Sequence, residues 1–277
     1  MVALLRLARP LNCIMSAAGV AVGGLVAAGA ATIGQFVVSV VVAAAAAASF
    51  TAGGNALNDI YDRATDAVNH PDRPLPSRSV TLAGAKGFVA VTFGIAAVLA
   101  AFVNVYALAM VALNGAMMFS YEASLKRLGG PGNVVIAYLV GSLFLFGGVS
   151  VYRVSFDPIA RTGVLASLAF FATLGREITK DIEDMRGDVD RKTIPQRLGA
   201  SKAGRLAATC LLAAVALSVL PLYFGLFGLG YAIPVALADG MFIYAALHSA
   251  AKPAVSQRVT KYGMIVALAA FLAGALL

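Results

Sequence analysis

Long apolar stretches separated by short polar segments dominate the chain. The stretch from Val37 to Phe50 is almost uniformly apolar and rich in Ala, whereas the strands of a membrane β-barrel alternate apolar and polar residues. Windows of about 20 mostly apolar residues are long enough for a helix to cross a bilayer. Such windows predict nine transmembrane helices, at residues 12–30, 36–56, 82–100, 103–121, 133–151, 160–178, 205–223, 228–249 and 259–277. The pattern therefore predicts an all-α polytopic membrane protein with nine transmembrane helices in one bundle.

The composition agrees with lipid as the outer solvent. The 277 residues are 60% hydrophobic and 12% charged, whereas soluble domains carry about 25% charged residues. A soluble globule needs more polar surface than this chain can supply. The net charge is +8, but no basic groove or aromatic-studded face accompanies it, so we expect no nucleic-acid partner. The chain predicts a single domain over 1–277, and nothing in it calls for an obligatory protein partner.

The basic residues predict how the bundle is oriented. With nine helices and a cytoplasmic N-terminus, only Arg153 and Arg161 of the 21 Lys and Arg residues fall on the outer side. This asymmetry is what the positive-inside rule predicts for a multi-pass protein of the plasma membrane. We therefore expect a cytoplasmic N-terminus, with the polar segments described next also facing the cytoplasm.

Most of the acidic residues lie in two segments that share one spacing. The sequence NDIYDRATD spans 58–66 and KDIEDMRGD spans 180–188, and both contain DxxDxxxD, which indicates an internal pseudo-repeat. On an α-helix, positions i, i+3 and i+7 share one face. Each segment is therefore predicted to direct three carboxylates the same way from the end of a helix. We call them the first and the second acidic segment.

Clustered carboxylates repel one another unless a cation lies between them, and Mg²⁺ prefers oxygen ligands. Two such clusters suit a diphosphate bridged by metal ions. The predicted ligands of Mg²⁺ are Asn58, Asp62, Asp66, Asp181, Asp184 and Asp188, and the predicted catalytic residues are Asp62, Asp66, Asp181 and Asp184. The alternative is an interfacial charge network in which these carboxylates pair with Arg63, Arg73, Lys180, Arg186 and Arg191.

Further residues are candidates for substrate binding. Arg73 lies in a proline-stiffened loop and Lys126 follows the fourth span, so both could bind phosphate or could only set topology. Tyr121 and Tyr138 could stabilise a carbocation or only pack. The predicted substrate-binding residues are Asn12, Asn58, Arg73, Tyr121, Lys126, Tyr138 and Lys180.

Two other features have both a functional and a structural interpretation. Glycines could open a channel for an apolar tail or could allow close helix packing, and these are Gly53, Gly54, Gly141, Gly147 and Gly148. Asp239 lies at membrane depth, where we expect a structural hydrogen bond or a pairing with His248 rather than a catalytic role.

These motifs resemble the UbiA superfamily of intramembrane prenyltransferases over nearly the whole chain. The resemblance rests on GGNALNDIYDRATDAVNHPDRPLPS at 53–77, SYEASLKR at 120–127 and GREITKDIEDMRGDVDRKTIP at 175–195. It implies Mg²⁺ bound by both acidic segments, an allylic prenyl diphosphate as donor, and prenyl transfer without a covalent enzyme intermediate. The chain departs from the family pattern after Asp188, where the loop is short and carries Asp190 and Arg191.

The resemblance also implies a particular acceptor. The motifs are most similar to those of archaeal members that transfer a geranylgeranyl group to geranylgeranylglyceryl phosphate in ether-lipid synthesis. Two alternatives stay open at this point. One is transfer to an aromatic acceptor such as 4-hydroxybenzoate, and the other is a metal or metabolite transporter. Transporters place their substrate near the bilayer midplane, whereas both acidic segments are predicted at one membrane edge, which favours an enzyme.

Overall fold

The fold is an all-α bundle. A computed structural model describes residues 2–153, 155, 157–185 and 192–276. The α-helices of this part are α1 (Val2–Ala8), α2 (Pro10–Ala28), α3 (Val37–Tyr61), α4 (Arg63–Asn69), α5 (Leu82–Val103), α6 (Val105–Ala123), α7 (Gly130–Ser150), α8 (Asp157–Asp184), α9 (Ile194–Leu198), α10 (Ala200–Leu217), α11 (Leu220–Tyr223), α12 (Leu229–His248) and α13 (Pro253–Leu276). Two short 3₁₀ helices accompany them, η1 (Ile33–Gln35) and η2 (Leu125–Leu128).

Within these described residues, eight helical stretches are long and apolar enough to cross a membrane. They correspond to eight of the nine predicted spans, with α10 and α11 together forming one of them. The remaining prediction, 103–121, does form a helix, α6, but this helix is not among the eight. Polar side chains such as Asn114, Ser120 and Glu122 interrupt its apolar sequence.

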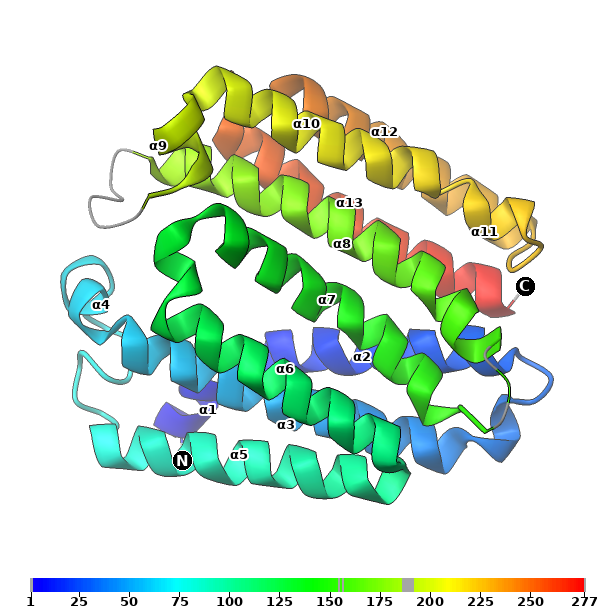
Figure 1. Ribbon diagram of the computed structural model, residues 1–277, viewed down its shortest axis with the longest axis horizontal. Helices are drawn as coiled ribbons and strands as arrows, with labels where there is room; N and C mark the ends of the chain where they lie inside the picture. Colours follow the sequence, from blue (N-terminus) through cyan, green and yellow to red (C-terminus); the bar gives the residue numbers. More distant parts are fainter. Residues whose placement is uncertain (1, 154, 156, 186–191, 277) are drawn as a thin grey trace.

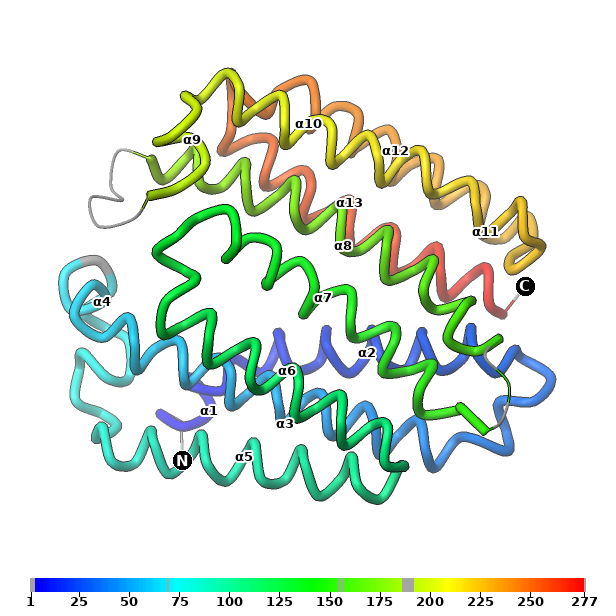
Figure 2. The backbone as a smooth tube through the Cα atoms, viewed as in Figure 1, coloured from blue at the N-terminus to red at the C-terminus, as the bar shows by residue number. Residues whose placement is uncertain are grey.

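The long helices run side by side in two groups (Figures 1 and 2). In the first group, α3 packs against α5 and α2, and in the second group α8 packs against α10 and α13, with α12 against α13. Helix α7 joins the groups because it packs against both α2 and α8. The polar connections that contain α4, η2 and α9 all lie at one end of the bundle, on the left of Figure 1.

Glycines allow the helices of the core to approach closely. A Cβ on Gly147 of α7 would overlap the Val20 carbonyl oxygen of α2, and one on Gly141 would lie 2.7 Å from the Ala166 carbonyl oxygen of α8. A Cβ on Gly53 of α3 would lie 2.6 Å from Oγ1 of Thr92 on α5. The structure therefore supports the packing interpretation of these glycines and not the channel interpretation.

Candidate active site

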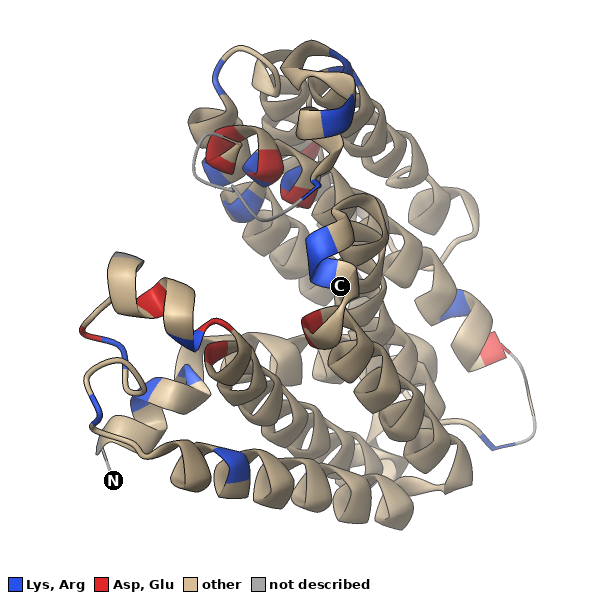
Figure 3. Ribbon diagram, turned by 60° about the vertical axis from the view of Figure 1, so that its left-hand side comes forward, with Lys and Arg blue, Asp and Glu red and all other residues tan. Residues whose placement is uncertain are grey.

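Both acidic segments lie at the same end of the bundle, as predicted. The first begins in the last turn of α3 and continues through α4, and the described part of the second forms the last turn of α8. Figure 3 shows the two groups of acidic and basic residues facing the same side of the molecule. Asp188 falls outside the described residues.

The first acidic segment is not a single continuous helix. Helix α3 ends at Tyr61, Asp62 adopts φ −84° and ψ 3°, and α4 begins at Arg63. The prediction that Asp59, Asp62 and Asp66 share one face of a continuous helix is therefore wrong, because the helix is interrupted at Asp62, between the other two. Asp59 and Asp66 both approach Arg73, whereas Asp62 turns to a different cation.

Each carboxylate of this segment has a basic partner. The Arg73 guanidinium donates to both oxygens of Asp66 at 2.7 and 2.6 Å, and lies 3.9 Å from Asp59. Asp59 also accepts a hydrogen bond from Arg9, and its side chain is only 3% exposed. Lys126 Nζ lies 2.6 Å from Asp62 Oδ2. Part of the charge-network interpretation thus holds, since Arg73 is one of the partners it named.

The second acidic segment has an amide partner. Asn133, buried near the start of α7, donates its Nδ2 to Asp181 Oδ2 at 2.8 Å. Asp181 is half-buried, whereas Asp184 and the predicted substrate residue Lys180 are exposed. The two aspartates lie three residues apart on one helix, as the spacing predicted for this segment.

The connection between α6 and α7, taken with the first turn of α7 as residues 124–133, contacts both acidic segments. Its Lys126 pairs with Asp62 and its Asn133 binds Asp181. The Arg127 carbonyl oxygen also accepts a hydrogen bond from the backbone N–H of Lys192, which follows the second acidic segment in the sequence. This connection therefore links side chains that are more than a hundred residues apart in sequence.

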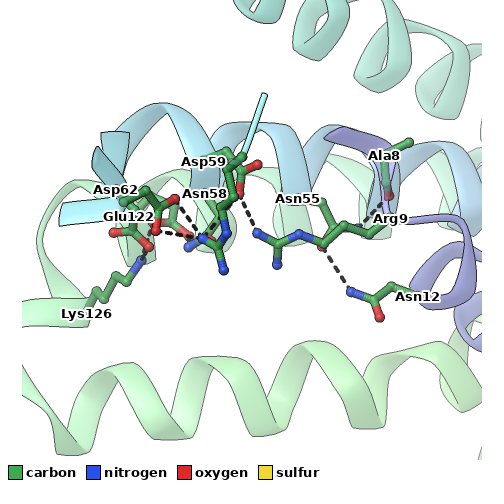
Figure 4. Close-up of polar contacts among 11 residues, drawn as sticks. Ala8, Arg9, Asn12, Asn55, Asn58, Asp59, Asp62, Glu122 and Lys126 are labelled. Carbon is green, nitrogen blue, oxygen red and sulfur yellow. Dashed lines mark hydrogen bonds and ion pairs between the residues drawn. The ribbon is translucent and has the colours of Figure 1, made fainter. Parts of the chain in front are cut away.

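Glu122 is a site residue that the sequence interpretation missed. Its side chain is fully buried, and its carboxylate accepts hydrogen bonds from Asn58 Nδ2 at 2.8 Å and from Lys126 Nζ at 3.2 Å (Figure 4). Glu122 directly follows the predicted span 103–121. Burial raises the pKa of its carboxyl group, and the nearby Lys126 ammonium offsets only part of this increase. Its spacing of four residues from Lys126 was the available signal.

The remaining predicted substrate residues lie at the margins of this cluster. The Tyr121 ring centroid lies 5.8 Å from Lys126 Nζ, so in this arrangement its face contacts a site cation. Tyr138 is half-buried in α7. Asn12 donates to Asn55 Oδ1 at 3.4 Å, and Asn55 in turn donates to the Ala8 carbonyl oxygen at 2.8 Å. Figure 4 shows these polar contacts following α3 from Asn12 to Lys126.

An apolar cavity of about 360 Å³ lies between α2, α7, α8, α10, α12 and α13. Asn12 and Met15 line it on α2, and Phe144 of α7 and Leu168 of α8 line it farther along. Asp239 also faces this cavity, and its Oδ2 lies 2.7 Å from Ser218 Oγ. The prediction of a structural hydrogen bond for Asp239 is confirmed.

The other partner suggested for Asp239 has different contacts. The His248 ring stacks on Tyr244 of the same helix, with ring centroids 4.2 Å apart, and its Nδ1 lies 2.8 Å from the Tyr244 carbonyl oxygen.

With this geometry in place, comparison with known proteins decides the family. The model of the UbiA prenyltransferase family matches residues 17–274. The chain belongs to the UbiA prenyltransferase family. It is therefore a prenyltransferase and a multi-pass membrane protein, and the transporter interpretation does not fit this assignment.

Relatives of known name extend the similarity over the full chain. The digeranylgeranylglyceryl phosphate synthase of Halobacterium salinarum is 39% identical, with 99% of this chain and 97% of the relative covered. A solved structure of a digeranylgeranylglyceryl phosphate synthase has a TM-score of 0.82 at 33% identity, covering 99% of this chain and 98% of its own. A UbiA homologue from Archaeoglobus fulgidus bound to GPP and Mg²⁺ shares the fold, with a TM-score of 0.60 at 17% identity and coverage of 96% and 99%.

The donor atoms of this UbiA-family site suit Mg²⁺ in kind, because they are carboxylate and amide oxygens. Asn58 Nδ2 is used by Glu122, so its Oδ1 is the atom left for other partners. Among the described residues, no three His, Cys, Asp or Glu side chains are placed together as a metal site. Asp62 and Asp66 instead bind Lys126 and Arg73, two cations of the type that also bind phosphate.

Proposed function

We propose that this UbiA-family enzyme transfers a geranylgeranyl group from its diphosphate to geranylgeranylglyceryl phosphate, in archaeal ether-lipid synthesis. The observation that carries the proposal is the pair of acidic segments at one end of the bundle, joined through Lys126 and Asn133. The full-length similarity to the enzyme of H. salinarum supports the choice of acceptor. Residues 1–277 are proposed to act as a single domain, with the acidic segments as a pseudo-repeat.

We also propose that α6 is the ninth span, predicted at 103–121, which places the two chain ends on opposite sides of the membrane. The polar end of the bundle, with the active site and the N-terminus, then faces the cytoplasm. The distribution of the basic residues supports this orientation, because all but Arg153 and Arg161 fall on that side.

The diphosphate is proposed to bind between the acidic segments. Mg²⁺ held by Asn58, Asp62, Asp66, Asp181, Asp184 and Asp188 would supply Lewis-acid stabilisation of the leaving group. In this proposal, Lys126 and Arg73 exchange their carboxylate partners for diphosphate oxygens and donate charge-assisted hydrogen bonds to them. The negative charge that develops on the leaving oxygen is thereby stabilised.

The transfer breaks the allylic C–O bond, and the bonding electrons leave with the diphosphate. The acceptor hydroxyl oxygen then bonds to the prenyl carbon and its proton is released. The carbocation character of that carbon requires a site from which water is excluded. The apolar cavity, which begins at Asn12 beside the polar cluster, is proposed to hold an isoprenoid tail. Tyr138 remains a candidate for contact with the prenyl carbocation.

The proposal is tested by offering two acceptors separately to the purified full-length protein. The protein is incubated with Mg²⁺ and geranylgeranyl diphosphate, with either geranylgeranylglyceryl phosphate or 4-hydroxybenzoate, and products are identified by mass. Product from the glyceryl acceptor alone is expected. Product from 4-hydroxybenzoate alone would favour the aromatic alternative, and no product from either would contradict the proposal. Asp184→Ala is expected to lose turnover while retaining the wild-type unfolding midpoint, because this residue is exposed.

A further inference from the structure

Glu122 is a buried carboxylate at the active site to which the proposed transfer assigns no role. It lies in the last turn of α6, and its side chain has no exposed area. Burying a carboxylate is costly unless hydrogen bonds and a cation compensate for the lost water. Both compensations come from the active site, since Asn58 and Lys126 are its partners.

The contact with Asn58 determines which way the amide of that residue faces. An asparagine amide has one oxygen, which can bind a metal ion, and one NH₂ group, which cannot. An ionised carboxylate only accepts hydrogen bonds, so Glu122 Oε1 selects the NH₂ group, at 2.8 Å. The reversed amide would bring its oxygen against the carboxylate oxygen. The buried Glu122 therefore leaves Asn58 Oδ1 available to the first acidic segment.

The contact with Lys126 keeps the ammonium at the site independently of Asp62. Lys126 Nζ lies 2.6 Å from Asp62 Oδ2 and 3.2 Å from Glu122 Oε2 (Figure 4). Asp62 is 23% exposed and belongs to the predicted metal ligands, whereas the Glu122 side chain is enclosed. When Asp62 turns to another cation, Glu122 still holds the ammonium within reach of a diphosphate.

We propose that Glu122 is a positioning residue for the diphosphate site. It orients the Asn58 amide oxygen as a metal ligand through one carboxylate oxygen and retains Lys126 through the other. The inference rests on the proposed function, because it assumes that Asn58 binds a metal ion beside a diphosphate. It adds a residue, on a third helix, whose effect on metal affinity is transmitted through its two neighbours.

The test measures metal binding rather than turnover. Full-length protein in detergent is titrated with Mn²⁺ in the presence of inorganic pyrophosphate, and bound Mn²⁺ is followed by electron paramagnetic resonance. Loss of an outer partner of a metal ligand weakens metal affinity by about 10- to 100-fold. Glu122→Leu is therefore expected to weaken Mn²⁺ binding by at least about tenfold. Asn114→Leu is the matched control, because it removes another polar contact of α6, the hydrogen bond from Asn114 Nδ2 to Ser142 Oγ at 3.0 Å. It is expected to bind Mn²⁺ like the wild type.

Glu122→Gln keeps the proposal testable if the leucine variant does not fold. The glutamine oxygen can still accept a hydrogen bond from Asn58. The negative charge that attracts the Lys126 ammonium is lost in this variant. Mn²⁺ affinity is therefore expected to fall less than in Glu122→Leu, while the pyrophosphate concentration needed for half-maximal Mn²⁺ binding rises. Wild-type behaviour of Glu122→Gln in both measurements would overturn the proposal, as would wild-type Mn²⁺ affinity in Glu122→Leu.

A double variant separates positioning from a general loss of structure. If Glu122 acts through Asn58, then Asn58→Ala combined with Glu122→Leu weakens Mn²⁺ binding no more than the stronger single variant does. Effects that multiply would show independent action and overturn the inference. Failure of the wild type to bind Mn²⁺ with pyrophosphate would instead contradict the proposed function itself.

Discussion

Two aspartates of the first acidic segment, Asp59 and Asp62, are expected to have different roles. Replacing Asp59 by alanine should mainly lower stability, whereas replacing Asp62 should mainly lower turnover. The side chain of Asp59 is 3% exposed and bonds to Arg9, whose side chain is 32% exposed. Losing a hydrogen bond between charged groups costs about 1.5–3 kcal/mol, and because Arg9 is partly exposed and can be solvated after the change, we expect Asp59→Ala to cost about 2 kcal/mol. Asp62 is 23% exposed and its partner Lys126 keeps Glu122, so Asp62→Ala is expected to cost about 1 kcal/mol.

Activity is expected to follow the reverse order. Asp62 is a predicted metal ligand, so Asp62→Ala loses turnover, whereas the Asp59→Ala protein that remains folded retains most of it. Thermal unfolding in detergent gives the stability difference, and product mass at a temperature below both midpoints gives turnover. Asp72→Ala is the control, because its pair with Arg6 at 3.4 Å is exposed and contributes little. A stable Asp59→Ala, or an active Asp62→Ala, would refute the division of roles between the two aspartates.

Three further outcomes follow from the same structure. Arg73→Leu leaves the buried Asp66 without its cation, so we expect the free energy of unfolding to fall by about 3 kcal/mol. Because Arg73 is proposed to bind phosphate, we also expect a higher KM for the prenyl diphosphate, and an unchanged KM would argue against that role. Excess EDTA is expected to abolish product formation and added Mg²⁺ to restore it, and activity that persists in EDTA would contradict the metal assignment. Gly147→Leu is expected to overpack α7 against α2, which lowers the free energy of unfolding by about 1–3 kcal/mol and therefore lowers the thermal midpoint. Gly163→Leu, where a Cβ meets open space, should leave the midpoint unchanged, and equal midpoints for the two variants would contradict the close packing.

Much of the architecture could be predicted from the sequence. Apolar windows of bilayer length located the helices, and the asymmetric basic residues placed the polar connections at one end, as the structure shows. Both signals are local, because the bilayer imposes the same requirement on every segment that crosses it. The same windows also predicted a span at 103–121, which forms helix α6 but is not among the eight clear candidates because of its polar residues.

The candidate site was only partly predictable. Repeated spacing and residue type identified the two acidic segments, but the interruption of the helix at Asp62 was not predicted, because a spacing argument assumes a continuous helix. Lys126 was identified, whereas its pairing with Asp62 across 64 residues was not. Asn133 was overlooked altogether, since a lone asparagine at a helix start carries no pattern that points to Asp181.

The sequence by itself thus determined that the chain is helical, that lipid surrounds it, and which residue types supply its chemistry. Only the tertiary structure decided which of those residues meet. Within the first acidic segment, Asp62 pairs with Lys126, whereas Asp59 and Asp66 both approach Arg73, because the packing of the helices fixes which connection each carboxylate meets. A buried charge needs hydrogen bonds or an opposite charge wherever the packing places it. Glu122 obtains both, from Asn58 and Lys126.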